Sequence, residues 1–180
     1  MAGKNERHGL ILVHTGNGKG KTTAALGLAF RAMGYDMKVL MVQFLKGAWK
    51  PGEYRAVQKF EPNFQIRPMG QGFLWVDAED EAERNQALVT RAWEYGREQV
   101  ASGDWDMVIF DEINYAIGYG MIPLLEVLNM LRTKPPLVHV VLTGRNAKEE
   151  VIELADTVTE MRPIKHAYER GRRAQKGVEF

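Results

Sequence analysis

The chain has 180 residues, 45% hydrophobic and 26% charged, which is typical of one globular domain over residues 1–180 and excludes a disordered or collagen-like chain. A formal net charge of +1 gives no general attraction to nucleic acid or to an anionic membrane. The absence of cysteine excludes disulfides, thiolate metal sites and a cysteine nucleophile. No early apolar run is long enough for a signal peptide or a membrane span, so we expect a cytoplasmic protein without membrane or nucleic-acid partners.

The first third of the chain predicts strands that alternate with a helix. Residues 9–15 (GLILVHT) are nearly all apolar and lead into a glycine-rich stretch, as expected for a strand buried on both faces of a parallel sheet. Residues 22–33 are good helix formers with a stripe of small and apolar side chains. Residues 38–44 predict a second strand and residues 64–68 a weaker one, with a loop over 47–54 between them.

The remaining elements continue the alternation. Residues 77–102 predict a long helix that begins with a cluster of acids, which indicates a first turn that suits the helix dipole rather than a metal site. The other predicted elements are strands over 107–110, 137–142 and 157–161, and helices over 123–131 and from a capping pair of Asn146 and Glu149 through Leu154. This order predicts an α/β fold with a mostly parallel sheet, helices on both faces, and ligands at the carboxyl ends of the strands.

The sequence GNGKGKTT lies between the first predicted strand and the first predicted helix, which is the context of a phosphate-binding loop. In such a loop the backbone amides and the helix N-terminus face phosphate oxygens, Lys21 adds positive charge, and the Thr22 hydroxyl can bind Mg²⁺. Thr15 stands where the usual motif has its first glycine, so the glycines begin one residue later. The expected phosphate-binding residues are Gly16, Asn17, Gly18, Lys19, Gly20, Lys21, Thr22 and Thr23.

Polar residues at the ends of two later strands can complete a nucleotide site. Asp111 and Glu112 could join Thr22 in holding Mg²⁺ or Mn²⁺, or they could cap a helix that begins at Ile113. Arg145 could bind a polyphosphate through its guanidinium, or it could form a surface ion pair.

Two further segments have open interpretations. Phe73 and Trp75 lie in the glycine-rich sequence GQGFLW, where they could contact a planar ligand or fold over an apolar patch. The tail from Lys165 to Phe180 has five Lys or Arg against two Glu. It could be a solvated surface helix or a segment that faces the site.

These motifs together resemble the ATP:corrinoid adenosyltransferases that have a phosphate loop. The resemblance rests on GNGKGKTTAALG, VQFLKG, GQGFLW, DEIN, LTGRN, TEMRPIKHAY and AQKGVEF, which occur in order over nearly the whole chain. It includes Thr in place of the first glycine of the loop. One difference is that only residues 1–8 precede the first predicted strand, where some relatives have a longer arm over the site.

The resemblance implies a P-loop NTPase fold of the RecA type and the transfer of the 5′-deoxyadenosyl group of ATP to cobalt(I) of a corrinoid, with release of triphosphate. It implies that Lys21, Phe73, Trp75 and Arg145 serve this reaction. Phe73 and Trp75 would exclude the lower axial ligand of the corrinoid. A reductant such as a reduced flavoprotein and a homodimer are also expected.

Two other functions share the phosphate loop and the DE strand. A small-molecule kinase would release ADP instead of triphosphate, and the lack of cysteine excludes the zinc-binding lid of the thymidine kinases. A RecA-type ATPase would use the basic tail on nucleic acid, and nucleic acid would then stimulate its hydrolysis of ATP.

Overall fold

A single six-stranded sheet organises the molecule, for which a computed structural model describes residues 7–46, 51–71 and 79–179. Its strands are β1 (Ile11–Thr15), β2 (Val39–Gln43), β3 (Phe64–Pro68), β4 (Met107–Asp111), β5 (His139–Thr143) and β6 (Thr157–Glu160). They lie in the order β3-β2-β4-β5-β1-β6, and every neighbouring pair is parallel. The α/β fold class and all six predicted strands are confirmed.

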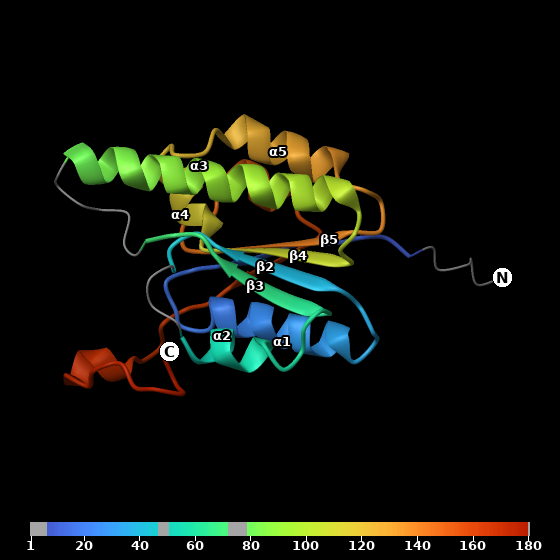
Figure 1. The fold of residues 1–180 in the computed structure, drawn as a ribbon. Helices are drawn as coiled ribbons and strands as arrows, with labels where there is room; N and C mark the ends of the chain where they lie inside the picture. The colour runs from blue at the N-terminus through green and yellow to red at the C-terminus, as the bar shows by residue number, and fades with distance from the viewer. Residues whose placement is uncertain (1–6, 47–50, 72–78, 180) are drawn as a thin grey trace.

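Helices cover both faces of this sheet (Figure 1). They are α1 (Lys21–Met33), α2 (Gly52–Val57), α3 (Glu79–Ser102), α4 (Ile113–Gly118), α5 (Leu124–Thr133) and α6 (Glu149–Leu154), with a short 3-10 helix over Ala167–Arg170. Helices α1 and α2 lie on one face, and α3, α4 and α5 lie on the other. Helix α6 packs on the second face, because Val151 belongs to the same buried cluster as side chains of α3, α4 and α5.

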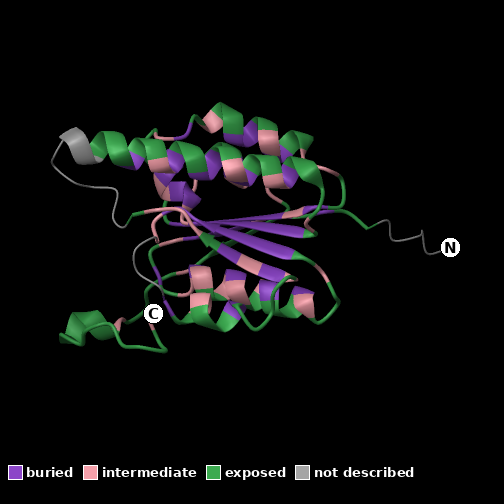
Figure 2. Ribbon diagram, viewed as in Figure 1, coloured by how far each residue is buried: buried purple, intermediate pink, exposed green. Residues whose placement is uncertain are grey.

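The central strands are buried on both sides, which explains why they appear in the sequence as continuous apolar runs (Figure 2). Phe110 of β4 packs between Phe44 and Trp93, with ring centroids 6.2 and 6.0 Å away. Helix α3 can come this close because Gly96 faces the Phe110 ring, where a Cβ would lie 2.4 Å from a ring carbon. The core therefore depends on a small residue in α3 opposite a large one in β4.

Three predicted local features differ from the structure. Helix α2 begins at Gly52, inside the segment predicted to be a loop, and its Val57 is buried beneath the sheet. Helix α4 begins at Ile113, as one of the two interpretations of Asp111 and Glu112 allowed, but the Glu112 side chain does not cap it. Helix α6 has Lys148 at its N-cap, and Asn146 lies outside the helix with a φ of 54°. The predicted Asn146–Glu149 capping pair is therefore wrong.

The topology brings the polar ends of several strands to one edge. Strand β1 pairs with β5 and β6, and β4 pairs with β2 and β5, so all five strands end side by side. Within the described residues, the helices all fall short of the length and apolarity needed to cross a membrane.

Candidate functional site

The loop after β1 takes a backbone course that its glycines permit. Gly16 and Gly20 have φ values of 91° and 117°, in the left-handed region that favours glycine. The backbone after β6 fixes this course, because the Gly18 amide donates to the Met161 carbonyl at 2.6 Å. A Cβ at Gly16 would lie 2.5 Å from that same carbonyl oxygen. The loop therefore fits between β1 and Met161 only with glycine at this position.

Lys21, the first residue of α1, lies beneath the loop. Its side chain is buried, and its ammonium donates to the carbonyls of Gly16 and Gly18, both at 2.8 Å. Burial lowers the pKa of Lys21, and the nearby Glu112 carboxylate acts in the opposite direction. A cation is thus held at the N-terminus of a helix, where an anion would also meet the positive end of the helix dipole.

Asp111 lies at the end of β4 with its side chain fully buried. Its Oδ1 accepts hydrogen bonds from the hydroxyls of Thr22 (2.8 Å) and Thr143 (2.9 Å). Its Oδ2 accepts from Nε2 of Gln43 at 3.2 Å. Three donors around one carboxyl group suit an ionised acceptor. Because Thr22 donates its proton to Asp111, the lone pairs of the Thr22 oxygen remain available to a cation.

Glu112 has an unusual backbone conformation, with φ 66° and ψ 21°. Its amide donates to Oγ1 of Thr143 at 2.8 Å, and its buried Oε2 has no hydrogen-bond partner among the described residues. Burial, followed by the neighbouring Asp111 charge, raises the pKa of Glu112 to about 7. A buried carboxyl oxygen without a partner is a candidate cation ligand.

We expect Glu112→Gln to stabilise the metal-free protein more at pH 8 than at pH 5. A carboxyl group whose pKa rises from 4.5 unfolded to about 7 folded favours the folded state below pH 4.5, and this contribution is lost as the pH rises through 7. The difference corresponds to about 2 to 3 kcal/mol of unfolding free energy. Urea unfolding in EDTA at both pH values measures it, with the exposed Glu150→Gln as control. An equal effect of Glu112→Gln at both values would contradict the prediction.

A cavity of about 810 Å³ opens over these residues. Of the predicted site residues it is lined by Asn17, Gly18, Lys19, Gly20, Lys21, Thr22, Thr23, Glu112 and Arg145. Gly16 and Asp111 lie behind this lining, joined to it through Lys21 and Thr22. The structure therefore brings the predicted phosphate and metal residues together. Phe73 and Trp75 lie outside the described residues.

The oxygen atoms at this place suit a hard divalent cation. Thr22 offers a hydroxyl oxygen and Glu112 a buried carboxyl oxygen without a partner. Mg²⁺ and Mn²⁺ prefer such ligands, usually together with phosphate oxygens of a substrate. The residues present therefore fit the expected metal.

The sequence did not single out three polar residues that complete the site. Gln43 and Thr143 hold Asp111 from the ends of β2 and β5. Lys46 lines the cavity, lies 2.7 Å from Oε1 of Glu53 and 4.0 Å from Oδ2 of Asp111, and adds a second lysine to the site. The sequence signal that could have identified Gln43 and Thr143 is a polar residue at the end of an apolar strand, because such ends meet at one edge of a parallel sheet.

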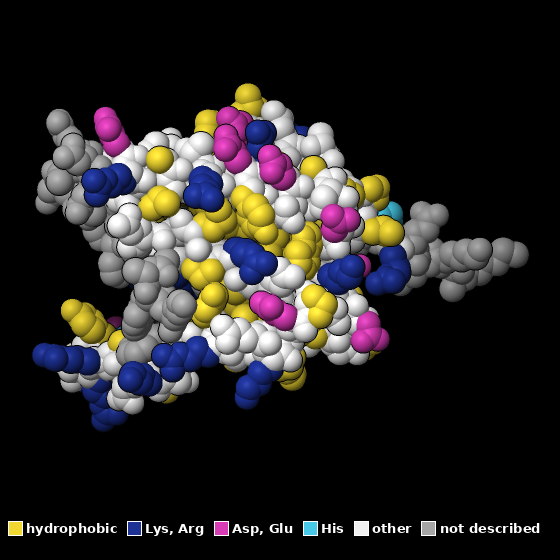
Figure 3. All heavy atoms as spheres, in the orientation of Figure 1, with side chains coloured by type: hydrophobic (Ala, Val, Ile, Leu, Met, Phe, Trp, Pro, Cys, Tyr) yellow, Lys and Arg dark blue, Asp and Glu magenta, His cyan; other side chains and the backbone are white. Residues whose placement is uncertain are grey.

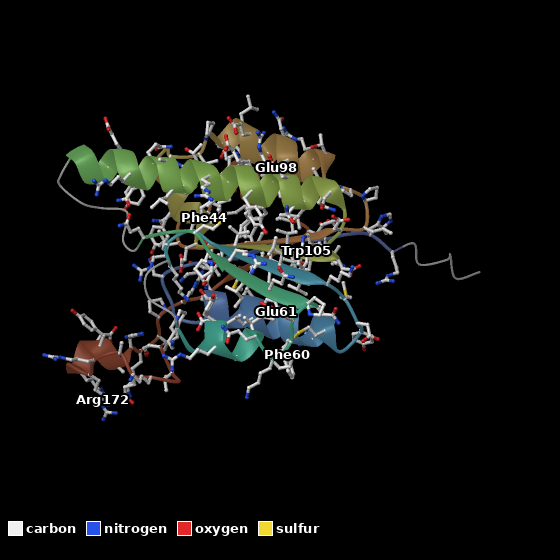
Figure 4. All side chains as sticks on the ribbon, viewed as in Figure 1. Phe44, Phe60, Glu61, Glu98, Trp105 and Arg172 are labelled. Atoms are coloured by element: carbon white, nitrogen blue, oxygen red, sulfur yellow. The ribbon has the colours of Figure 1, made fainter. Side chains whose placement is uncertain are left out.

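The C-terminal segment lies against the phosphate loop. Lys19 Nζ donates to the Val178 carbonyl at 2.7 Å and is 3.8 Å from Oε2 of Glu179. Residues within and on both sides of the short 3-10 helix line the cavity, including His166 before it, Tyr168 within it and Val178 after it. The Lys and Arg side chains of the segment gather at its surface (Figure 3), and Arg172 points away from the sheet (Figure 4). The structure thus favours a segment that faces the site.

We expect truncation after Ile164 to raise the Michaelis constant for ATP severalfold, because it removes one wall of the cavity and the partners of Lys19. Steady-state kinetics measure this change. The full-length variant Arg172→Ala/Arg173→Ala is the control, since it removes two charges that do not line the cavity. If the Michaelis constant for ATP rises equally in both proteins, the loss of positive charge causes the effect, and the contact of the segment with the loop does not.

Comparison with known proteins gives a consistent result. The model of a family described as ATP:corrinoid adenosyltransferase BtuR/CobO/CobP matches residues 7–180. A corrinoid adenosyltransferase of Sinorhizobium sp is 47% identical over 182 residues, covering 100% of this chain and 84% of that protein. The corrinoid adenosyltransferase CobA of Salmonella typhimurium is 41% identical over 180 residues, covering 100% of this chain and 90% of that protein.

A solved structure supports the fold. The crystal structure of a KaiC-like protein from Pyrococcus horikoshii OT3 matches with a TM-score of 0.52 and 18% identity, covering 86% of this chain and 73% of that one. At this identity the similarity concerns the fold alone. It confirms the predicted P-loop NTPase fold of the RecA type.

Proposed function

The chain belongs to the ATP:corrinoid adenosyltransferase family BtuR/CobO/CobP, and from this membership we propose how its cavity carries out the reaction. Adenosylation of a corrinoid with ATP as donor is its activity. In the proposed step the cobalt(I) electron pair attacks the 5′-carbon of ATP and a cobalt–carbon bond forms. The bond from that carbon to the phosphate oxygen breaks, cobalt becomes formally cobalt(III), and triphosphate leaves with the electron pair.

The observation that supports this proposal is the concentration of phosphate-binding groups in one cavity. The residues of the loop from Asn17 to Thr23, which include Lys21, line the same cavity as Arg145. Such groups stabilise the negative charge that develops on a leaving triphosphate, an effect worth several kcal/mol in enzymes. Because cobalt is the nucleophile, this step needs no protein nucleophile and no general base.

We propose that Thr22 and Glu112 hold Mg²⁺ or Mn²⁺ directly. Asp111 already accepts three hydrogen bonds, so it acts by orienting Thr22. When bound, the metal supplies positive charge beside the phosphate oxygens. Glu112, which lines the same cavity as Lys21 and Arg145, then provides the negative charge that balances it.

The corrinoid would meet the nucleotide at the open side of the cavity. We propose that Phe73 and Trp75 lie against its lower face, as the resemblance of GQGFLW to the family motif implies. A reduced flavoprotein would supply one electron to convert cobalt(II) to cobalt(I). We propose that the reaction takes place in the cytoplasm, because the cytoplasm provides both ATP and reducing conditions.

We propose a homodimer, since twofold dimers are the commonest assemblies of soluble proteins and the family resemblance favours one. Light scattering at micromolar concentration tests this proposal, and a fully active monomer would contradict it.

The decisive experiment is anaerobic incubation of the protein with ATP and a chemically reduced corrinoid. Alkylation of cobalt changes the ultraviolet-visible spectrum, and chromatography identifies the phosphate product. We expect triphosphate in equal amount to the alkylated corrinoid. Release of ADP would indicate a kinase, and stimulation by nucleic acid would indicate a RecA-type ATPase, two functions that the family match does not favour.

A further inference from the structure

Thr143, at the end of β5, connects both acidic residues of the site through one oxygen atom. Its hydroxyl donates to Oδ1 of Asp111 at 2.9 Å and accepts from the amide of Glu112 at 2.8 Å. The residue is fully buried. Because the Glu112 amide can only donate, the Thr143 proton is directed to Asp111, and the two bonds fix each other.

The backbone of Glu112 needs such support. A residue other than glycine in the left-handed region costs about 1 to 2 kcal/mol relative to ordinary conformations. Without Thr143 the partly buried Glu112 amide would lose the acceptor that the structure gives it. The left-handed turn separates β4 from α4 and thereby determines the direction in which the Glu112 side chain leaves the backbone.

A second contact holds β5 and α4 together at the same point. Asn114 Nδ2 donates to the Gly144 carbonyl at 2.9 Å. Gly144 has a φ of 126°, and a Cβ there would lie 2.9 Å from Cβ of Asn114. The chain after Thr143 therefore packs directly on α4, so the Thr143 hydroxyl is held in register with the Glu112 amide.

We infer that Thr143 is a positioning residue that aims Asp111 and Glu112 so that Thr22 and Glu112 can bind the metal together. The inference rests on the proposed function, because it assumes the metal site described there. Thr143 does not line the cavity, so it acts through the Asp111 carboxyl group and the Glu112 backbone amide and not on the substrates.

The test compares Thr143→Val, which removes the hydroxyl at nearly constant volume, with Thr143→Ser, which keeps it. Calorimetry measures the dissociation constant of ATP without corrinoid, once in EDTA and once with Mg²⁺. We expect Thr143→Val to reduce the gain in affinity from Mg²⁺ about tenfold or more, as the loss of a partner behind a metal ligand usually does. ATP affinity in EDTA should stay within about threefold, a change below 1 kcal/mol. Thr143→Ser should restore the gain.

Val141→Ala is the matched control, because Val141 is also fully buried in β5, two residues earlier. It should lower the thermal midpoint without changing the gain from Mg²⁺. A Thr143→Val protein with the full gain, or an equal loss in Val141→Ala, would overturn the inference. The variant Thr22→Ala distinguishes an error in the inference about Thr143 from an error in the proposed metal site. If Thr22→Ala loses the gain while Thr143→Val keeps it, only the inference is wrong, and if both keep it the proposed metal site is wrong.

Discussion

We expect Lys21→Ala to lower kcat/KM for ATP about 1000-fold while the protein remains folded. The Lys21 ammonium is a buried cation at the start of α1, and it donates to two carbonyls of the loop that lines the cavity. The substitution removes a positive charge whose attraction to the triphosphate increases as the triphosphate separates from the adenosyl group and gains negative charge. Alanine is the best helix former at this position, so circular dichroism and the thermal midpoint should change little.

Lys134→Ala is the control for this experiment. Lys134 is also a partly buried lysine whose ammonium donates to a backbone carbonyl, that of Gly9, and burial lowers its pKa as well. It precedes β5, at the opposite edge of the sheet from the cavity. Its loss should leave kcat/KM for ATP unchanged. Turnover of Lys21→Ala near that of the wild type at subsaturating ATP would exclude the loop from the site.

The second large effect concerns Phe73 and Trp75. A cobalt(II) corrinoid is hard to reduce while an axial ligand donates electron density to the metal. An apolar side chain at the lower face excludes water and the base of the corrinoid, which leaves a centre that accepts an electron more readily. We therefore expect Phe73→Ala and Trp75→Ala to lower the rate by about tenfold or more when the assay starts from cobalt(II) and a mild reductant.

The same two variants should lose much less activity when a strong reductant supplies cobalt(I) directly, because binding of ATP and the alkylation step are retained. Phe60→Ala is the control, since Phe60 is a partly exposed aromatic residue beyond the end of α2 (Figure 4). It should behave like the wild type in both assays. If Phe73→Ala and Trp75→Ala lose equal activity in the two assays and also unfold more easily, the residues merely anchor their loop.

The sequence was sufficient to predict the strands and the phosphate loop. Four of the strands, β1, β2, β4 and β5, are runs of apolar residues, because both faces of this part of the sheet are covered, and the loop is recognisable from glycines before a Lys-Thr pair. Asp111, Glu112 and Arg145 were also predicted at the site, since each follows a predicted strand. Their roles remain predictions.

The sequence was not sufficient for features that depend on contacts between distant segments. Gln43 and Thr143 look like ordinary polar residues after apolar strands until the strand order places them on either side of Asp111. Helix α2 follows a proline and begins with glycine, both typical of a loop, yet Val57 becomes buried against the sheet. Asn146 and Glu149 have the spacing of a helix capping pair, but Asn146 has a left-handed backbone conformation and lies outside the helix.

The strand order also determines when the nucleotide site can form during synthesis of the protein. Strand β1 and its loop are synthesised before the other described strands, but the two neighbours of β1 are β5 and β6, the last of the described strands to be made. The carbonyl of Met161, which holds Gly18 in place, comes later still. Until β5 and β6 are synthesised, the apolar strand β1 therefore has neither of its partners, and ATP can stabilise the protein only once this part of the chain is present.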